Sequence, residues 1–152
     1  MRTGNDNVEI YIAGALVYTT REVGAAFQGE SIHSGEDVVQ HLGSIQSMPQ
    51  EVFVVMSLNS ANKPLKTRWI TVGLLDCNQV HPREVFADPL MDRAAAVIVA
   101  HNHPSGTLEP SPEDLALTKR LQKAGELLGI KVLDHVIVSP TGFVSLKQQG
   151  KM

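Results

Sequence analysis

The apolar positions of the chain gather into short runs of strand length, separated by polar segments that contain proline and glycine. EVFVVMSLNS (51–60) and AAAVIVA (94–100) are almost wholly apolar, which is typical of strands covered on both faces of a sheet. LKTRWITVGLL (65–75) follows the first of them after a turn sequence, so we expect a hairpin. KVLDHVIV (131–138) and GFVSL (142–146), divided by the turn SPTG, predict a closing pair of strands.

The first strand-like run is VEIYIAGALVY, residues 8–18, with apolar side chains at Ile10, Ile12 and Val17. Because Gly14 interrupts the run, we expect one edge strand with a bulge or a bend. An edge strand of this kind offers a surface on which a second copy can pair, so a homodimer is one of the expected oligomeric states.

Three segments with helical spacing lie between the strands, at residues 34–45, 81–94 and 112–128. The first begins with Ser34 as an N-cap candidate, the second has Pro82 at a first helical position, and the third ends before Gly129. Strands and helices thus mix along the chain, which predicts an α/β fold with a mixed sheet flanked by helices. The length suits a single domain over residues 1–152.

The composition is that of an ordinary globular protein, with 43% hydrophobic and 19% charged residues. The longest apolar runs are much shorter than the roughly twenty residues that span a bilayer, and the first ten residues lack the apolar region of a signal peptide. The single cysteine, Cys77, cannot form an internal disulfide, so we expect a cytoplasmic protein. The net charge of −3 gives no basic excess for a dedicated nucleic-acid binder, and any DNA contact would be local.

The stretch AHNHPSGTLEPSPED (100–114) contains the residues with the most specific chemistry. His101 and His103 are two positions apart at the end of a predicted strand, so both imidazoles point to the same side, with Cα atoms about 6 to 7 Å apart. Zinc accepts imidazole nitrogens and a carboxylate, and in catalytic sites it keeps a fourth position for water. The proline and glycine that follow allow the chain to turn and the next helix to bring Asp114 back toward the histidines. The spacing therefore favours one metal site.

Three other interpretations of this stretch have less support. Ser111 and Asp114 form an S-x-x-D helix start with Pro112 at the first helical position, so capping alone would explain both residues. The letters HNH at 101–103 do not indicate an HNH nuclease, because that fold takes these residues from positions spread over a ββα unit. A zinc deaminase would need H-x-E followed by P-C-x-x-C, which the sequence lacks.

The spacing H-x-H, seven residues, S, two residues, D resembles the JAMM motif of the JAB1/MPN metalloproteases; its positions here are His101, His103, Ser111 and Asp114. Over about residues 30–150 the chain looks like the RadC-like branch of that superfamily, through the blocks HPREVF (81–86), AHNHPSG (100–106), LTKRLQKAGELLGI (117–130) and LDHVIV (133–138). The resemblance implies a three-layer α/β fold of the JAB1/MPN, cytidine-deaminase-like type. It also implies one zinc ion per chain, held by the two histidines and Asp114.

Larger members of that family carry a helix-hairpin-helix DNA-binding segment before this domain, and residues 1–30 are too short and too strand-like to form one. Glu51 matches the family's catalytic acid/base glutamate, although by itself it would be taken for a solvated residue at a strand start. Ser111 is implied as the donor to the oxyanion. The implied function is a zinc-dependent metallopeptidase or isopeptidase acting on an unidentified peptide or protein. A DNA-repair-associated or nucleic-acid-linked factor, and a metal-binding interaction module without turnover, stay open as alternatives.

Three further groups of residues are candidates for chemistry. Asp134 and His135 are either a pair that orients a metal ligand or an internal pair on a strand. Cys77 and His81 favour a loop before a helix over a second metal site. The last predicted helix also carries a basic cluster, made up of Lys119, Arg120 and Lys123. This cluster favours a solvated helix face over a nucleic-acid patch.

Overall fold

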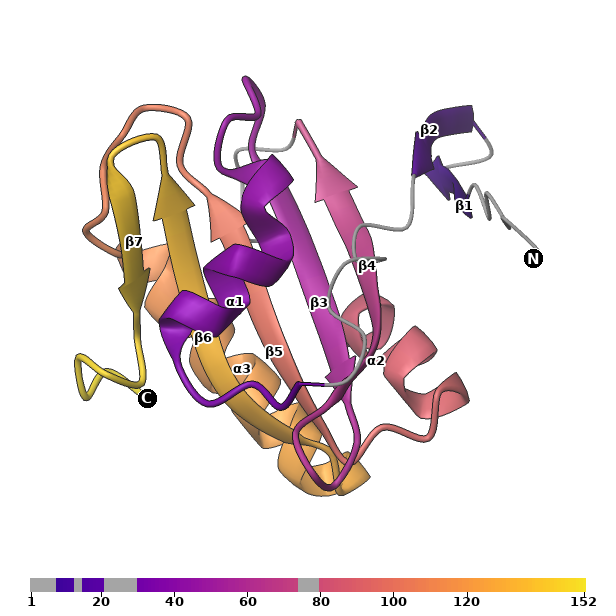
Figure 1. Cartoon of the computed structure of the whole chain (residues 1–152). Helices are drawn as coiled ribbons and strands as arrows, with labels where there is room; N and C mark the ends of the chain where they lie inside the picture. The colour runs from indigo at the N-terminus through magenta and orange to yellow at the C-terminus, as the bar shows by residue number, and fades with distance from the viewer. Residues whose placement is uncertain (1–7, 13–14, 21–29, 74–79) are drawn as a thin grey trace.

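The computed structural model describes residues 8–12, 15–20, 30–73 and 80–152, and its main body is a five-stranded mixed sheet between helices (Figure 1). The strands, in their order across the sheet, are β4 (Pro64–Val72), β3 (Val52–Leu58), β5 (Ala96–Asn102), β6 (Lys131–Ser139) and β7 (Gly142–Ser145). β5 and β6 pair in parallel, and the other neighbours in this sheet pair antiparallel. Both predicted strand pairs, β3 with β4 and β6 with β7, are confirmed.

Helices cover both faces of this sheet. The helix α1 (Gly35–Leu42) lies on one face, and α2 (Pro82–Met91) and α3 (Pro112–Leu128) lie on the other (Figure 1). The predicted three-layer α/β architecture is therefore confirmed. A short 3₁₀ helix, η1 (Gly43–Ile45), extends α1, so the segment predicted as one helix over 34–45 changes from α to 3₁₀ winding near its end.

The central strands β3 and β5 are buried at every residue, as their apolar sequences predicted. Successive side chains of a strand point to opposite faces of the sheet, and here they divide between two cores. Val54 packs in the core under α1, whereas Phe53 packs with the side chains of α2 and α3. Phe53 is paired with His101 across the β3–β5 ladder. The same alternation therefore places His101 on the α3 face and its neighbour Asn102 on the α1 face.

The helices α1 and α3 begin with the same capping device. The Oγ of Ser34 accepts a hydrogen bond from the backbone N–H of Asp37 at 3.3 Å, and the Asp37 carboxylate accepts one from the N–H of Ser34 at 2.9 Å. Ser111 and Asp114 repeat both contacts at 3.1 and 2.8 Å. Each box satisfies two of the backbone N–H groups that a helix start leaves without partners. The predicted caps are confirmed, and in α3 the cap also fixes the position of Asp114.

One prediction about the N-terminal run is wrong. Instead of a single edge strand over residues 8–18, β1 (Val8–Ile12) and β2 (Ala15–Thr20) pair with each other antiparallel in a separate two-stranded sheet. A glycine inside an alternating apolar run is compatible with a break between two strands as well as with a bulge, and the local pattern does not distinguish the two. The homodimer stays a prediction that this pairing does not test.

Smaller predictions outside the main site can also be placed. His81 is the N-cap of α2, where its Nδ1 accepts from the N–H of Arg83 at 3.2 Å, in agreement with a loop before a helix; Cys77 lies outside the described residues. The basic cluster on α3 is exposed, as expected of a solvated face, and Arg120 donates to the Val80 carbonyl at 2.6 Å. Among the described helices, none is long and apolar enough to cross a membrane.

Candidate metal centre

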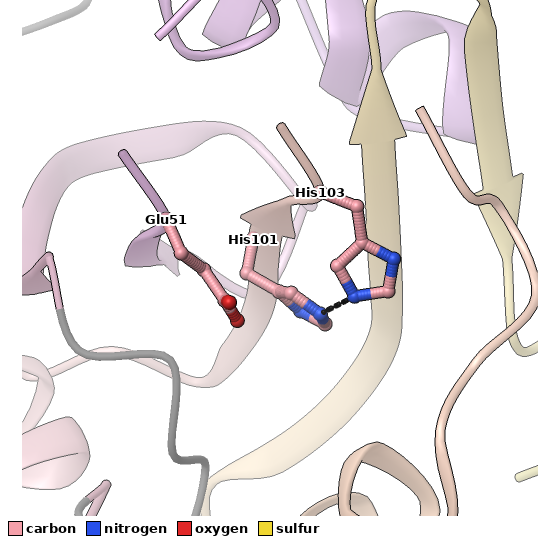
Figure 2. A group of neighbouring side chains, drawn as sticks. All are labelled: Glu51, His101 and His103. Carbon is pink, nitrogen blue, oxygen red and sulfur yellow. Dashed lines mark hydrogen bonds between the residues drawn. The ribbon is translucent and has the colours of Figure 1, made fainter. Parts of the chain in front are cut away.

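The end of β5 and the start of α3 bring three predicted ligands together. The Nε2 atoms of His101 and His103 lie 2.9 Å apart (Figure 2). The carboxylate of Asp114 reaches both of them, with Oδ1 3.2 Å from Nε2 of His101 and Oδ2 3.5 Å from Nε2 of His103. His101 and Asp114 are buried, with 0% and 1% of their side-chain surface exposed. The predicted turn of the chain after the histidines therefore does return Asp114 to them.

The spacing of these donor atoms suits one metal ion. Ligand atoms bound tetrahedrally to zinc at about 2.0 to 2.2 Å stand about 3.3 to 3.6 Å from one another. The observed separations of 3.2 and 3.5 Å are close to that range, and the 2.9 Å between the two imidazole nitrogens is a few tenths of an ångström shorter. Two imidazole nitrogens that face each other also need a proton or a metal ion between them, because their lone pairs would otherwise repel. Either a proton or a metal ion can therefore occupy the place between these donor atoms.

Glu51 completes the group from the neighbouring strand. It directly precedes β3, and the antiparallel pairing of β3 with β5 puts it opposite the end of β5 that carries the histidines. Its carboxylate points toward His101 in Figure 2, and one ligand atom each from Glu51, His101 and His103 lie within 4.8 Å of one another. These three residues are close enough to hold a metal ion. Asp114 makes shorter contacts than Glu51 with both imidazoles.

The charges of the site influence one another. Burial raises the pKa of the Glu51 carboxyl, and the nearby imidazoles of His101 and His103 oppose that effect. The hydrogen bond to Asp114 raises the pKa of His103 above its ordinary value. A carboxylate that favours a positive charge on its histidine partner favours a bound cation at the same place.

A chain of buried hydrogen bonds supports His101 from behind. Its Nδ1 lies 2.8 Å from Nε2 of His135, whose Nδ1 lies 2.7 Å from Oγ1 of Thr118. The Thr118 hydroxyl donates to the backbone carbonyl of Asp114 at 2.7 Å. With His101 bound to a metal through Nε2, its Nδ1–H donates to His135, and the Nδ1–H of His135 donates to Thr118. Every donor in this relay then has an acceptor, and the relay links two of the predicted ligands, His101 and Asp114.

His135 stays neutral in this role, because complete burial lowers its pKa well below the ordinary value.

Asp134 does not belong to the relay, although the sequence suggested Asp134 and His135 as a pair. Its carboxylate accepts from the Ser145 hydroxyl at 2.6 Å and from the N–H of Lys147 at 3.1 Å. These contacts hold the C-terminal turn on the α1 side of the sheet. Only His135 of the two neighbours faces the metal ligands, since adjacent strand residues point to opposite faces.

Thr118→Val is expected to lower metal affinity by about tenfold, near the low end of what is lost when outer partners of a metal ligand are removed. Valine leaves the Nδ1–H of His135 without an acceptor, so His135 no longer holds the His101 ring in one orientation. Thr118→Ser is the matched control, because it keeps the hydroxyl and should retain nearly full affinity. Competition with a chromophoric chelator measures both. An equal loss in the two variants would contradict the relay.

Ser111 lies at the N-terminus of α3, next to the ligands in the chain. Its Oγ uses a lone pair to accept from the Asp114 N–H, and that bond does not use the hydroxyl hydrogen.

A cavity of about 280 Å³ opens beside Glu51 and His103. It is lined by Pro49, Gln50, Glu51, Gly73, His103, Pro104 and Ser105. A substrate segment can therefore approach Glu51 and His103 from this side.

Two polar residues of the site, Thr118 and Asn102, have little local signal in the sequence. Thr118 lies one helical turn after Asp114, on the same face of α3, and that spacing of four could have indicated a contact. Asn102 separates the two histidines and was considered only as part of the letters HNH. Its side chain is fully buried on the other face of the sheet. Phe53 stacks on His101 with ring centroids 6.0 Å apart, a contact that the apolar pattern of its strand does not indicate.

Comparison with known proteins finds one matching family and many similar proteins. Residues 32–151 match the RadC-like JAB domain. The chain is 43% identical over 136 residues to a UPF0758 protein of Shouchella clausii, covering 85% of this chain and 59% of that protein. It is 48% identical over 112 residues to one of Methanospirillum hungatei, covering 74% and 50%, and 44% identical over 139 residues to one of Caldanaerobacter subterraneus, covering 90% and 60%. The chain thus spans 50 to 60% of the length of these relatives, whose names state no activity.

Proposed function

Since this chain belongs to the RadC-like JAB domain family, we propose that it is a zinc-dependent hydrolase that cleaves peptide or isopeptide bonds. The observation that carries the proposal is the arrangement of two carboxylates around one pair of histidines. Asp114 contacts both imidazoles at 3.2 and 3.5 Å, whereas Glu51 belongs to the looser group that lies within 4.8 Å. One carboxylate is therefore assigned as a ligand and the other as a base, with His101 and His103 as the remaining ligands.

The reaction needs a nucleophile, a base and a proton donor. Zinc, when bound, lowers the pKa of water toward neutrality and polarises the scissile carbonyl. Glu51 takes one proton from the attacking water as the water oxygen bonds to the carbonyl carbon. Glu51 then gives that proton to the amine nitrogen as the C–N bond breaks, which leaves a free amine and a carboxylic acid that loses its proton to water. The Ser111 hydroxyl donates to the oxygen on which negative charge develops.

The direct test uses the purified chain with metal content fixed. The protein is stripped with a chelator, reloaded with one equivalent of zinc, and incubated with a panel of unstructured peptides and lysine-linked isopeptides. Mass spectrometry then looks for new amine and carboxylate ends. Cleavage that disappears in the stripped protein and returns with zinc supports the proposal. Cleavage of DNA instead, with salt-dependent DNA binding and loss in Glu51→Gln, would replace it with a nucleic-acid-linked function.

Ser111→Ala is expected to lower turnover by about 10²- to 10³-fold, the usual cost of removing one donor to an oxyanion. It also removes a helix cap, which costs about 1 kcal/mol of folding free energy. Ser34→Ala is the matched control, because Ser34 forms the same capping box in α1. It should lower stability by a similar amount and leave turnover unchanged. Steady-state hydrolysis and chemical denaturation of both variants separate the two effects, and equal turnover in them would refute the catalytic role.

A further inference from the structure

We infer that Asn102, the residue between the two histidine ligands, positions Glu51 by clamping the backbone on both sides of it. This inference rests on the proposed function, since it concerns the residue assigned there as the base. Asn102 is fully buried, with 0% of its surface exposed. It is the last residue of β5, and its side chain points to the face of the sheet opposite to that of His101.

The side chain of Asn102 makes three hydrogen bonds to one short segment. Its Oδ1 accepts from the backbone N–H of Val52 at 2.6 Å. Its Nδ2 donates to the carbonyls of Met48 and Gln50 at 3.2 and 3.0 Å. Both amide hydrogens and the amide oxygen are thus used, and all three backbone partners lie within three residues of Glu51. No residue with a single polar atom can hold such a segment from both ends.

The strand pairing explains why a side chain is needed at this place. The β3–β5 ladder runs from Leu58 opposite Ala96 to Phe53 opposite His101, and there it ends. The next pair in register would be Val52 with Asn102, and the side-chain amide takes the place of the backbone partner. On the other edge, the N–H of Gly73 donates to the Glu51 carbonyl at 2.8 Å. The backbone of Glu51 is therefore held from both neighbouring strands.

The consequence is a fixed distance between the base and the metal ligands. Asn102 lies between His101 and His103 in β5, so through its hydrogen bonds it also fixes where the backbone of Glu51 lies relative to both histidines. A displacement of about 1 Å in a catalytic group can cost about 10²-fold in rate. Metal binding needs only the histidines and Asp114, so it does not depend on this clamp. The clamp also holds Gln50 and Glu51 as one wall of the 280 Å³ cavity.

The test compares Asn102→Ser with Asn59→Ser in the zinc-loaded and the stripped full chain. Asn59 lies at the other end of β3, where its Oδ1 accepts from the N–H groups of Ala61 and Lys63 at 2.9 and 3.0 Å. Asn59→Ser is the matched control, because it also removes hydrogen bonds between an asparagine side chain and the backbone, but away from the site. Three readouts are taken for each protein: amide hydrogen exchange by NMR, zinc affinity by chelator competition, and kcat and KM for a cleaved peptide.

In the wild type the Val52 amide is expected to exchange slowly, and in Asn102→Ser its protection should fall while zinc affinity stays nearly unchanged. The kcat should fall by about 10²-fold with a smaller change in KM. Asn59→Ser should change none of the three. Rapid exchange of Val52 in the wild type overturns the clamp whatever the activity, and full kcat in Asn102→Ser overturns its role toward Glu51. If the wild type cleaves no peptide, the proposed function fails by itself, and the exchange data still decide whether the clamp exists.

Discussion

Glu51→Gln is expected to keep its metal and its fold and to lose about 10²- to 10⁴-fold in turnover, the range that a positioned general base contributes. Glutamine has nearly the same shape as glutamate, so the backbone bonds that hold this segment are unaffected. Its amide cannot take a proton from water. The loss should therefore appear in kcat, while zinc affinity stays within the range of the wild type.

The side chain of Glu51 is half-buried beside two histidines and Asp114, which makes its charge part of the balance of the site. Because Glu51→Gln removes one negative charge, any small change in zinc affinity should be a decrease. Glu126→Gln is the control, because Glu126 is exposed on α3 and the substitution is chemically the same. Hydrolysis assays at saturating zinc compare the two variants. Full turnover in Glu51→Gln would remove Glu51 from the mechanism and with it the proposed reaction.

The sheet and the helix order could be predicted because their signals are local. The buried strands β3 and β5 are apolar runs, and the starts of α1 and α3 carry serine and aspartate at capping distance. The separate β1–β2 hairpin could not be distinguished from a bent strand, because a glycine inside an alternating run is compatible with both. Such choices are decided by pairing with other segments, which a local pattern does not contain.

In the candidate site, too, the residues with a local sequence signal could be predicted and the others could not. His101, His103 and Asp114 lie within fourteen residues of one another in the sequence, and their spacing alone favoured a shared metal site, whereas Ser111 and Glu51 were assigned to it only through the family resemblance. The supporting residues come from other elements, and their contacts depend on register. In the β5–β6 pair the register shifts between Val97 and Ile98. A shift of one residue exchanges the faces of a strand, so the sequence could not tell which of Asp134 and His135 would meet the ligands.

His101→Ala combined with His103→Ala is expected to abolish binding of about one zinc ion per chain. Two of three protein ligands are then missing, and a single buried carboxylate does not hold zinc against water. Elemental analysis of protein purified without chelators measures the metal content directly. His33→Ala is the control, since His33 is exposed in the loop before α1 and should leave the zinc content unchanged.

The double variant also tests whether the metal stabilises the fold. A ligand that binds only the folded state adds about 2.7 kcal/mol at a free concentration one hundred times its Kd. The Tm of the wild type and of His33→Ala should therefore rise with added zinc, whereas the Tm of the double variant should not change. The shift is measured against the stripped form of each protein, so the instability caused by leaving the buried Asp114 carboxylate with fewer partners cancels. A zinc-dependent rise of normal size in the double variant would place the metal elsewhere in the chain and would leave the capping of α3 as the role of Ser111 and Asp114.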